Sequence, residues 1–319
     1  MEVKLPQFME EALGTFGVAA DGLLKEFFGP LDAAPPPATI YHYTNDLGLR
    51  GILETGRLWL SDIFSLNDPS ELRHGFSHLV KILDTKAKGG PRESQLVAED
   101  FTRFLHDGLD KSAHFFVLSF SSIDDDLGQW RAYADNGRGY ALGFDGKALE
   151  EAFIKASGVR IQNFSTFKVK YDDAELIALH ERLIESMWHL ISLPHDKSVP
   201  RDAINPYMKN LFVKLTMYAL SAALLFKHRG YKNEEEFRFL QVFKADETPP
   251  ELMQRFRSDE VVKYREFDWR RTAAGALKQI IVGPAADRHK GKRFAEDCLA
   301  AFNYGKVPVT HSAIPYRAV

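Results

Sequence analysis

A helical block between two groups of strands constrains the fold of this chain more than any other feature. Residues 173–193 and 203–227 are typical of two long helices, and the second contains the apolar run LTMYALSAALLF. Residues on both sides of the block favour short strands, because Tyr, Phe, Val and Ile are enriched there. Strands early and late with helices between them predict an α+β protein with mixed or antiparallel sheets wrapped by helices.

Composition excludes several classes of protein. The apolar run at 215–226 is shorter than the roughly 20 residues of a membrane-spanning helix, so we expect a core helix and no membrane partner. The 41 basic and 44 acidic residues leave a net charge of −3, which provides no global attraction to nucleic acid. One cysteine, Cys298, argues against a disulfide framework, and no secretory signal is visible. We therefore expect a soluble, cytoplasmic protein.

The first 34 residues differ from the rest, with six acids and two bases. Their large apolar residues have the spacing of one or two amphipathic helices: Leu13, Phe16, Leu23, Leu24, Phe27 and Phe28. Three prolines at 35–37 end any helix. The sequence thus predicts an arm and linker over 1–37, then a single α+β domain over 38–319 with its helical block at about 173–227. The arm either docks on the main body or forms a homodimer or partner interface.

Short strands are predicted on both sides of the helical block. The predicted ranges are 40–44, 57–61, 115–120, 139–145, 164–171, 235–243, 261–267 and 278–282. The segment FFVLSF at 115–120 is apolar on both faces, which favours a central strand. Asn45 or Asp46 can cap a helix that Gly56 ends, and KAKGGPRES at 86–94 is typical of a surface loop.

Two segments, one early in the chain and one near its middle, carry polar or aromatic residues that packing alone does not require. His42 and Thr44 share one face of the first strand, where polar groups need partners. His42 is either a core histidine whose ring is hydrogen-bonded to the backbone or part of a polar site. Trp130 and Tyr133 share one face of a helix. They form either aromatic core or a stacking wall for a flat ring.

A late strand carries three charged residues on one face, Glu234, Glu236 and Arg238. Such groups are expensive to bury unless they are paired. The segment is therefore either a solvated edge with Glu–Arg pairing or a carboxylate directed into a cleft and oriented by Arg238.

Other chemical signals are weaker. His74 and His78 have the i, i+4 spacing of two metal ligands, but no acid falls between them and no third ligand is evident. We therefore predict no metal at the functional site and keep a metal-dependent hydrolase or nuclease as a rival class. Dinucleotide-binding, P-loop and nucleophile-elbow motifs are absent from the sequence.

Taken together, these segments resemble the bacterial domain-of-unknown-function 2971 family. Tyr41–Ser61 carries a His-Tyr-Thr strand and Leu-Trp-Leu-Ser, and Leu66–Glu71 carries Leu-Asn-Asp-Pro-x-Glu. Phe120–Asp145 carries Phe-Ser, Trp-x-x-Tyr and Gly-Phe-Asp. Lys227–Arg238 carries Lys-His and Glu-x-Glu-x-Arg, and Ile280–Pro284 has the sequence IIVGP. The resemblance covers about residues 40–285. The family name implies no activity.

The segment Tyr41–Ser61 is also similar to the opening of ADP-ribosyltransferase folds, especially bacterial toxins that modify nucleic acid. Those folds begin with a His strand and a helix ending in Ile-Leu-x-x-Gly, and Glu234-x-Glu236 resembles their acidic motif. The chain departs from them in having no clear Ser-Thr-Ser motif and a large helical block. This resemblance implies an ADP-ribosyltransferase-like core with a helical insertion.

The same resemblance implies an enzyme that cleaves NAD and passes ADP-ribose to a nucleic acid, a protein or water, as a bacterial toxin or defence effector. Glu236 and His42 would be catalytic: Glu236 stabilises an oxocarbenium-like state, and His42 donates to a ribose hydroxyl. The further NAD-binding residues would be Tyr43, Thr44, Ser61, Arg131, Tyr133, Glu234 and Arg238. The alternative is a non-enzymatic module that binds a nucleotide or nucleic acid in a stress or defence system.

Overall fold

The computed structural model of the chain describes residues 4–28, 35–66, 71–156, 164–195, 199–257 and 260–318. Its contacts divide the chain into two units, where the sequence predicts an arm and a single domain. The helical unit comprises residues 1–34, 68–112 and 170–229, and the sheet unit comprises residues 35–67, 113–169 and 230–319. Each unit thus combines segments that are distant in the sequence.

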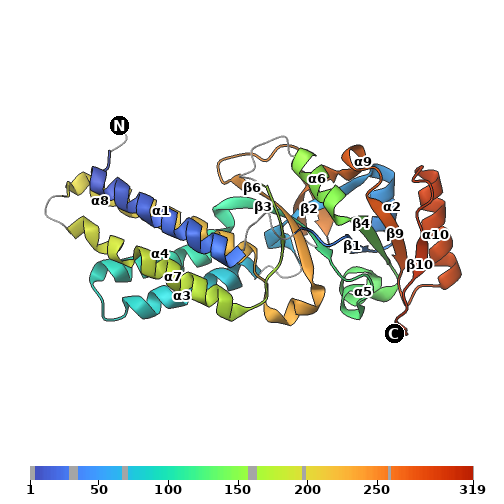
Figure 1. Cartoon of the computed structure of the whole chain (residues 1–319), viewed down its shortest axis with the longest axis horizontal. Coiled ribbons are helices and arrows are strands. Elements are labelled where there is room, and N and C mark those ends of the chain that lie inside the picture. The colour runs from blue at the N-terminus through green and yellow to red at the C-terminus, as the bar shows by residue number, and fades with distance from the viewer. Residues whose placement is uncertain are drawn as a thin grey trace. The chain divides into compact units, whose positions relative to one another are not determined.

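Long helices build the helical unit (Figure 1). They are α1 (Gln7–Phe28), α3 (Glu71–Ala87), α4 (Arg92–Asp107), α7 (Asp173–Trp188) and α8 (Arg201–Leu224). Helix α3 contacts α4, α7 and α8, so it lies at the centre of the unit. The helical block expected at 173–227 corresponds to α7 and α8, and α1, α3 and α4 join it. Helix α4 begins at Arg92, inside the segment expected to be a loop.

Helix α1 packs on its own chain. Its buried residues are Met9, Leu13, Phe16 and Ala20, which recur every three or four positions and form one face. This helix contacts α7 and α8, and the Phe16 ring meets the Tyr218 ring edge-on at 5.9 Å. Of the two alternatives for the N-terminal arm, the structure shows docking on the chain itself. The end of the arm, residues 29–34, lies outside the described residues.

We expect Tyr218→Phe to lower the free energy of unfolding by about 0.5–1.5 kcal/mol, the usual net contribution of one hydrogen bond. The Tyr218 hydroxyl lies 3.1 Å from the Gly17 carbonyl oxygen and 3.1 Å from the Asp21 carboxylate, and it donates to one of them. Phenylalanine keeps the ring contact with Phe16. Urea unfolding of the variant beside wild type measures the loss, and unchanged stability would show that this hydroxyl does not anchor α1.

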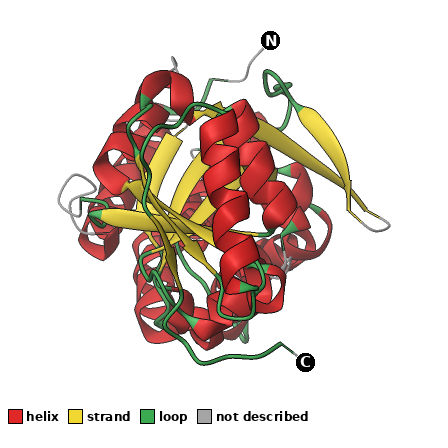
Figure 2. Ribbon diagram, turned by 90° about the vertical axis from the view of Figure 1, so that its right-hand side faces the viewer, coloured by secondary structure: helices red, strands yellow, loops and turns green. Residues whose placement is uncertain are grey.

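The described strands form one ten-stranded sheet (Figure 2). They are β1 (Thr39–Thr44), β2 (Arg57–Asp62), β3 (Ala113–Ser121), β4 (Tyr140–Asp145), β5 (Phe164–Lys168), β6 (Glu236–Lys244), β7 (Met253–Arg257), β8 (Glu260–Asp268), β9 (Leu277–Val282) and β10 (Val309–His311). The order is β10-β9-β4-β1-β3-β2-β8-β7, with β6 on β3 and β5 on β6. Only β10 and β9 pair in parallel among the described strands, so the sheet is mixed and the α+β fold class is confirmed.

One face of the sheet carries the core of its unit. Shorter helices belong to this unit: α2 (Asp46–Thr55), α5 (Leu127–Tyr133), α6 (Gly146–Ala156), α9 (Trp269–Thr272) and α10 (Arg288–Ala301). The core includes Phe116, Phe120 and Phe239 from the strands, with Leu53 from α2 and Phe153 from α6. Alternation along β3 and β6 places these side chains on one face and leaves the charged residues of β6 described below on the other.

Helix α2 follows the local rules that the sequence predicts. The Asn45 side chain accepts a hydrogen bond from the Gly48 backbone N–H, and Gly56 ends the helix at φ 68°. The short helix therefore returns the chain into β2 and fixes the spacing of β1 and β2. Among the described residues, no helix is long and apolar enough to cross a membrane.

The sheet divides at β3, which has one partner strand on one side and two on the other. On one side β6 pairs with β3 along its length, from Ala113↔Lys244 to Ser121↔Glu236. On the other side β1 pairs with β3 at Tyr41↔Ser121, and β2 pairs with it at Ser61↔Val117 and Asp62↔Phe116. Residues 118–120 have no strand partner on that side among the described pairs. The strand expected to be central therefore lies at the point where β1 and β2 separate.

Candidate functional site

Ser119 on β3 joins the two residues predicted to be catalytic. Its hydroxyl donates to Oε1 of Glu236 at 2.5 Å, and its backbone carbonyl oxygen lies 3.3 Å from Nδ1 of His42. The two predicted residues thus lie on opposite sides of one strand, with Glu236 on β6, which pairs with β3, and His42 on β1, which pairs with β3 only at Tyr41↔Ser121. The distant segments around residues 42 and 236 therefore meet at the division of the sheet.

Glu236 and Arg238 form a buried ion pair on β6. The Arg238 Nε donates to Oε1 of Glu236 at 2.6 Å, and Nη2 donates to Oε2 at 2.9 Å. Both residues are buried, with 3% of Glu236 and 1% of Arg238 exposed. This two-point contact is the strong form of an ion pair and satisfies both carboxylate oxygens. Arg238 thus orients the Glu236 carboxylate, as one of the two alternatives from the sequence predicts.

The register of β3 and β6 explains why these groups meet. Ser119 pairs with Arg238, and Ser121 pairs with Glu236. Residues directly opposite each other in an antiparallel pair point to the same face. Since Phe237 and Phe239 point into the core, Glu236 and Arg238 share the other face with the two serines. The solvated edge strand that the sequence left open as an alternative is wrong at these positions.

His42 fills the division between β1 and β3. Its ring meets the Phe120 ring edge-on at 5.9 Å, so it lies toward the core face, whereas Glu236 lies on the other face. Burial lowers the pKa of His42, and the hydrogen bond to the Ser119 carbonyl opposes this effect. Because a carbonyl oxygen can only accept, Nδ1 carries the proton and Nε2 of the neutral ring is an acceptor. His42 is therefore arranged to accept from a hydroxyl rather than to donate to one.

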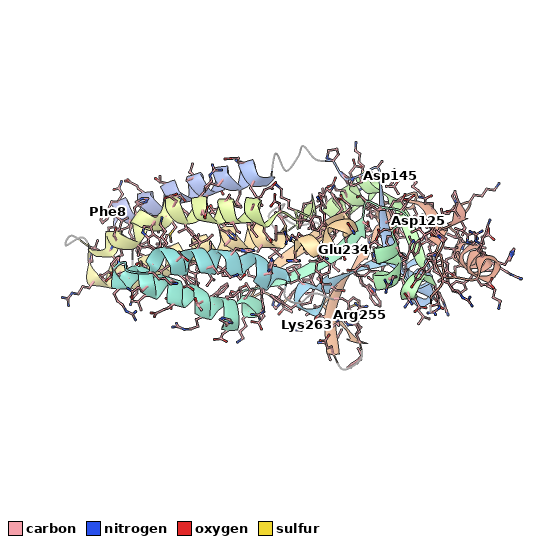
Figure 3. The ribbon with its side chains drawn as sticks, turned by 90° about the horizontal axis from the view of Figure 1, so that it is seen from below. Phe8, Asp125, Asp145, Glu234, Arg255 and Lys263 are labelled. Carbon is pink, nitrogen blue, oxygen red and sulfur yellow. The ribbon has the colours of Figure 1, made fainter. Side chains whose placement is uncertain are left out.

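Glu234 presents the more exposed carboxylate of the acidic motif. The Tyr133 hydroxyl donates to Oε1 of Glu234 at 2.9 Å, and the Ser121 hydroxyl donates to the Glu234 backbone oxygen at 2.7 Å. Tyr133 and Glu234 are both partly exposed (Glu234 is labelled in Figure 3). The structure thus brings Tyr133 from α5 to the acidic motif.

Tyr43 belongs to the aromatic core on this face of the sheet. Its ring meets that of Trp130 edge-on at 4.9 Å, and its hydroxyl donates to the Ile123 carbonyl at 2.9 Å. Burial raises the pKa of the Tyr43 hydroxyl. Of the two tyrosines predicted to bind NAD, Tyr43 is buried and Tyr133 is partly exposed.

The remaining predicted binding residues are dispersed. Ser61 on β2 accepts a hydrogen bond of 3.3 Å from Nη2 of Arg255, which also lies over the Trp59 ring at 5.0 Å. Arg255 belongs to the β7–β8 hairpin, which Figure 3 marks with Arg255 and Lys263. Thr44 is partly exposed at the end of β1, and Arg131 is exposed on α5. Of the two arginines predicted to bind NAD, Arg131 is exposed and Arg238 is buried.

The sequence motifs include Phe120-Ser121, but sequence reasoning assigned neither Ser119 nor Ser121 a role in the site. A further signal is that FFVLSFS carries two serines at alternate positions in an otherwise apolar strand. A strand expected to be buried on both faces does not require hydroxyls there, so these serines indicate a polar partner across the strand.

Comparison with known proteins supports the family resemblance but indicates no particular activity. A model of the family described as Protein of unknown function (DUF2971) matches residues 129–239. That range covers Trp130, Tyr133 and the segment from Glu234 to Arg238, so the resemblance inferred from these motifs is confirmed there. The motif at Leu66–Glu71 falls largely on residues 67–70, outside the described residues. Searches of curated proteins and of solved structures find no match.

Proposed function

We propose that the sheet unit binds NAD at the division of its sheet, cleaves the nicotinamide–ribose bond and passes ADP-ribose to a macromolecule or to water. The observation that carries this proposal is the contact chain from His42 through Ser119 to Glu236. It joins the first and last motifs of the resemblance to ADP-ribosyltransferase folds within one small region.

The chemistry needs a negative charge close to a ribose. Loss of nicotinamide develops positive charge on the sugar, as in glycoside cleavage, and a fixed carboxylate stabilises it. The Arg238 and Ser119 contacts hold Glu236 rigidly, and the more exposed Glu234 carboxylate is fixed by Tyr133. In this proposal Glu236 faces the ribose and Glu234 faces the acceptor. Neutral His42, on the opposite face of the sheet, accepts a hydrogen bond through Nε2 from a hydroxyl of the second ribose, on the adenosine side of NAD.

The decisive test is release of nicotinamide from NAD by the purified full-length chain, followed by chromatography with nucleic acid, protein or buffer alone as acceptor. We expect wild type and Glu235→Gln to release nicotinamide and Glu236→Gln to release very little. Glu235 lies between the two motif glutamates but pairs with Lys168 at 2.6 Å near the surface, so it is a matched control. If wild type releases no nicotinamide with any acceptor, the cleavage proposal is wrong.

A binding module without cleavage is the second candidate, and one observation favours it. Glu236 is almost fully buried and both of its oxygens already accept hydrogen bonds from Arg238. A structural ion pair beneath a nucleotide site requires no reaction. Calorimetric titration with NAD and ADP-ribose separates the candidates: binding of both ligands without nicotinamide release supports the module, whereas turnover rules it out.

A further inference from the structure

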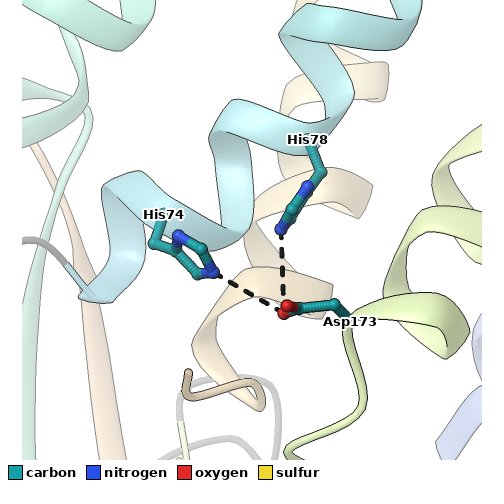
Figure 4. A group of neighbouring side chains, drawn as sticks. All are labelled: His74, His78 and Asp173. Carbon is teal, nitrogen blue, oxygen red and sulfur yellow. Dashed lines mark ion pairs between the residues drawn. The ribbon is translucent and has the colours of Figure 1, made fainter. Parts of the chain in front are cut away.

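A second cluster of chemically active side chains lies within the helical unit (Figure 4). His74 and His78 project from one side of α3 toward Asp173, the first residue of α7. The distance from Oδ1 of Asp173 is 3.6 Å to Nε2 of His74 and 3.8 Å to Nε2 of His78. All three atoms lie within 4.8 Å of one another. The acid that no local pattern supplied to the two histidines thus comes from a distant helix.

These distances are too long for hydrogen bonds, whose donor and acceptor atoms lie about 2.7–3.2 Å apart. Within the described part of the chain, none of the three facing atoms has a hydrogen-bond partner, although all three are shielded from solvent. Ligand atoms about 2.0–2.2 Å from a tetrahedral metal ion lie about 3.4 Å from one another. The observed spacing is therefore closer to that of atoms that share a cation than to that of atoms that share a proton.

Helix capping does not explain the position of the carboxylate. Asp172 is the residue that caps α7, since its side chain accepts from the Ala174 backbone N–H. Asp173 follows it and directs its carboxylate to α3 instead (Figure 4). An acid with no capping role, held between two imidazoles, requires another explanation.

Another histidine lies near this cluster. His180 lies two turns along α7, fully buried, and neither ring nitrogen has a hydrogen-bond partner among the described residues. Burial lowers the pKa of His180 to about 3, so this ring is neutral. The side chains of His74 and Asp173 are each 32% exposed and that of His78 is 12% exposed, which leaves a route from solvent.

We propose that His74, His78 and Asp173 bind one divalent transition-metal ion, with zinc as the reference ion. Two imidazole nitrogens and one carboxylate oxygen are a donor set typical of zinc and of ferrous iron, and three protein ligands leave a position for water or a further ligand. His228 lies beside this position, with its ring centroid 5.2 Å from that of His74. The ion connects α3 to the start of α7 and does not depend on the NAD proposal.

The test uses full-length protein purified without a polyhistidine tag and freed of metal with a chelator. Cobalt and then zinc are titrated by visible absorption and calorimetry. We expect one equivalent per chain. The affinity should fall more than about 100-fold in His78→Ala and Asp173→Asn, since loss of even an outer hydrogen-bond partner of a metal ligand costs about 10–100-fold.

Two variants serve as matched controls. Asp172→Asn removes the neighbouring charge but keeps a capping side chain, and His106→Ala removes an exposed histidine of α4. Both should bind as wild type does. If a ligand variant loses its helical circular dichroism signal, NMR of the cobalt-loaded wild type replaces it. The signals that the bound cobalt shifts should then include the ring N–H protons of two histidines. No binding to wild type, or equal binding to the ligand and control variants, would overturn the proposal.

Discussion

Glu236→Ala is expected to lower the free energy of unfolding by about 3–5 kcal/mol, the usual cost of breaking a buried ion pair by removing one of its members. The variant leaves the Arg238 guanidinium, 1% exposed, without the carboxylate that accepts from its Nε and Nη2. It also removes the acceptor of the Ser119 hydroxyl. Denaturant unfolding followed by circular dichroism measures the loss.

Two comparisons make this prediction specific. Replacing both partners, as in Glu236→Met with Arg238→Met, should recover most of the lost stability, since apolar replacement of a buried pair is often close to neutral. Glu260→Ala breaks an exposed pair with Arg257, with an N–O distance of 3.0 Å, and should cost at most about 1 kcal/mol. If Glu236→Ala costs no more than Glu260→Ala, the pair does not have the buried character described above.

Locally encoded features of the fold could be predicted from the sequence. The strand at residues 40–44 and the helix from Asp46 to Gly56 were predicted correctly because caps and β-branched or aromatic residues act within a few positions. Helix α4 was missed at its start, because KAKGGPRES is typical of a loop although Pro91 occupies the N-cap position of that helix. Strand β7, with the sequence MQRFR, was missed because its residues are largely exposed and carry little apolar alternation.

The sites were harder to predict because they depend on contacts between distant segments. The charged face of residues 234–238 was recognised, but whether it was buried depended on Ser119 and on the register of β3 with β6. Asp173 was indistinguishable from any acid at a helix start until α7 was placed beside α3. Periodicity identifies the face on which a residue lies, whereas the opposing residue is set by tertiary packing.

The largest effect is expected in the rate of NAD cleavage. If Glu236 stabilises the oxocarbenium-like state, Glu236→Gln should lower turnover by about 10²–10³, the scale of removing one fixed electrostatic contact, and should keep most of the affinity for NAD. Glutamine retains the shape of the side chain and an oxygen that can accept from Ser119 or Arg238. Turnover is measured by nicotinamide release at a temperature where circular dichroism shows the variant to be folded.

His42→Ala should produce the opposite pattern. Its proposed hydrogen bond to a ribose hydroxyl exists before reaction begins, so its removal should weaken NAD binding more than it slows the reaction of the bound complex.

Glu234→Gln should change acceptor transfer more than nicotinamide release, because Tyr133 holds that carboxylate at the more exposed end of the motif. Binding and turnover measured side by side for the three variants distinguish these roles. Equal losses of affinity and rate in all three variants would mean that the three residues maintain the structure of the site and have no separate roles in binding, cleavage and transfer.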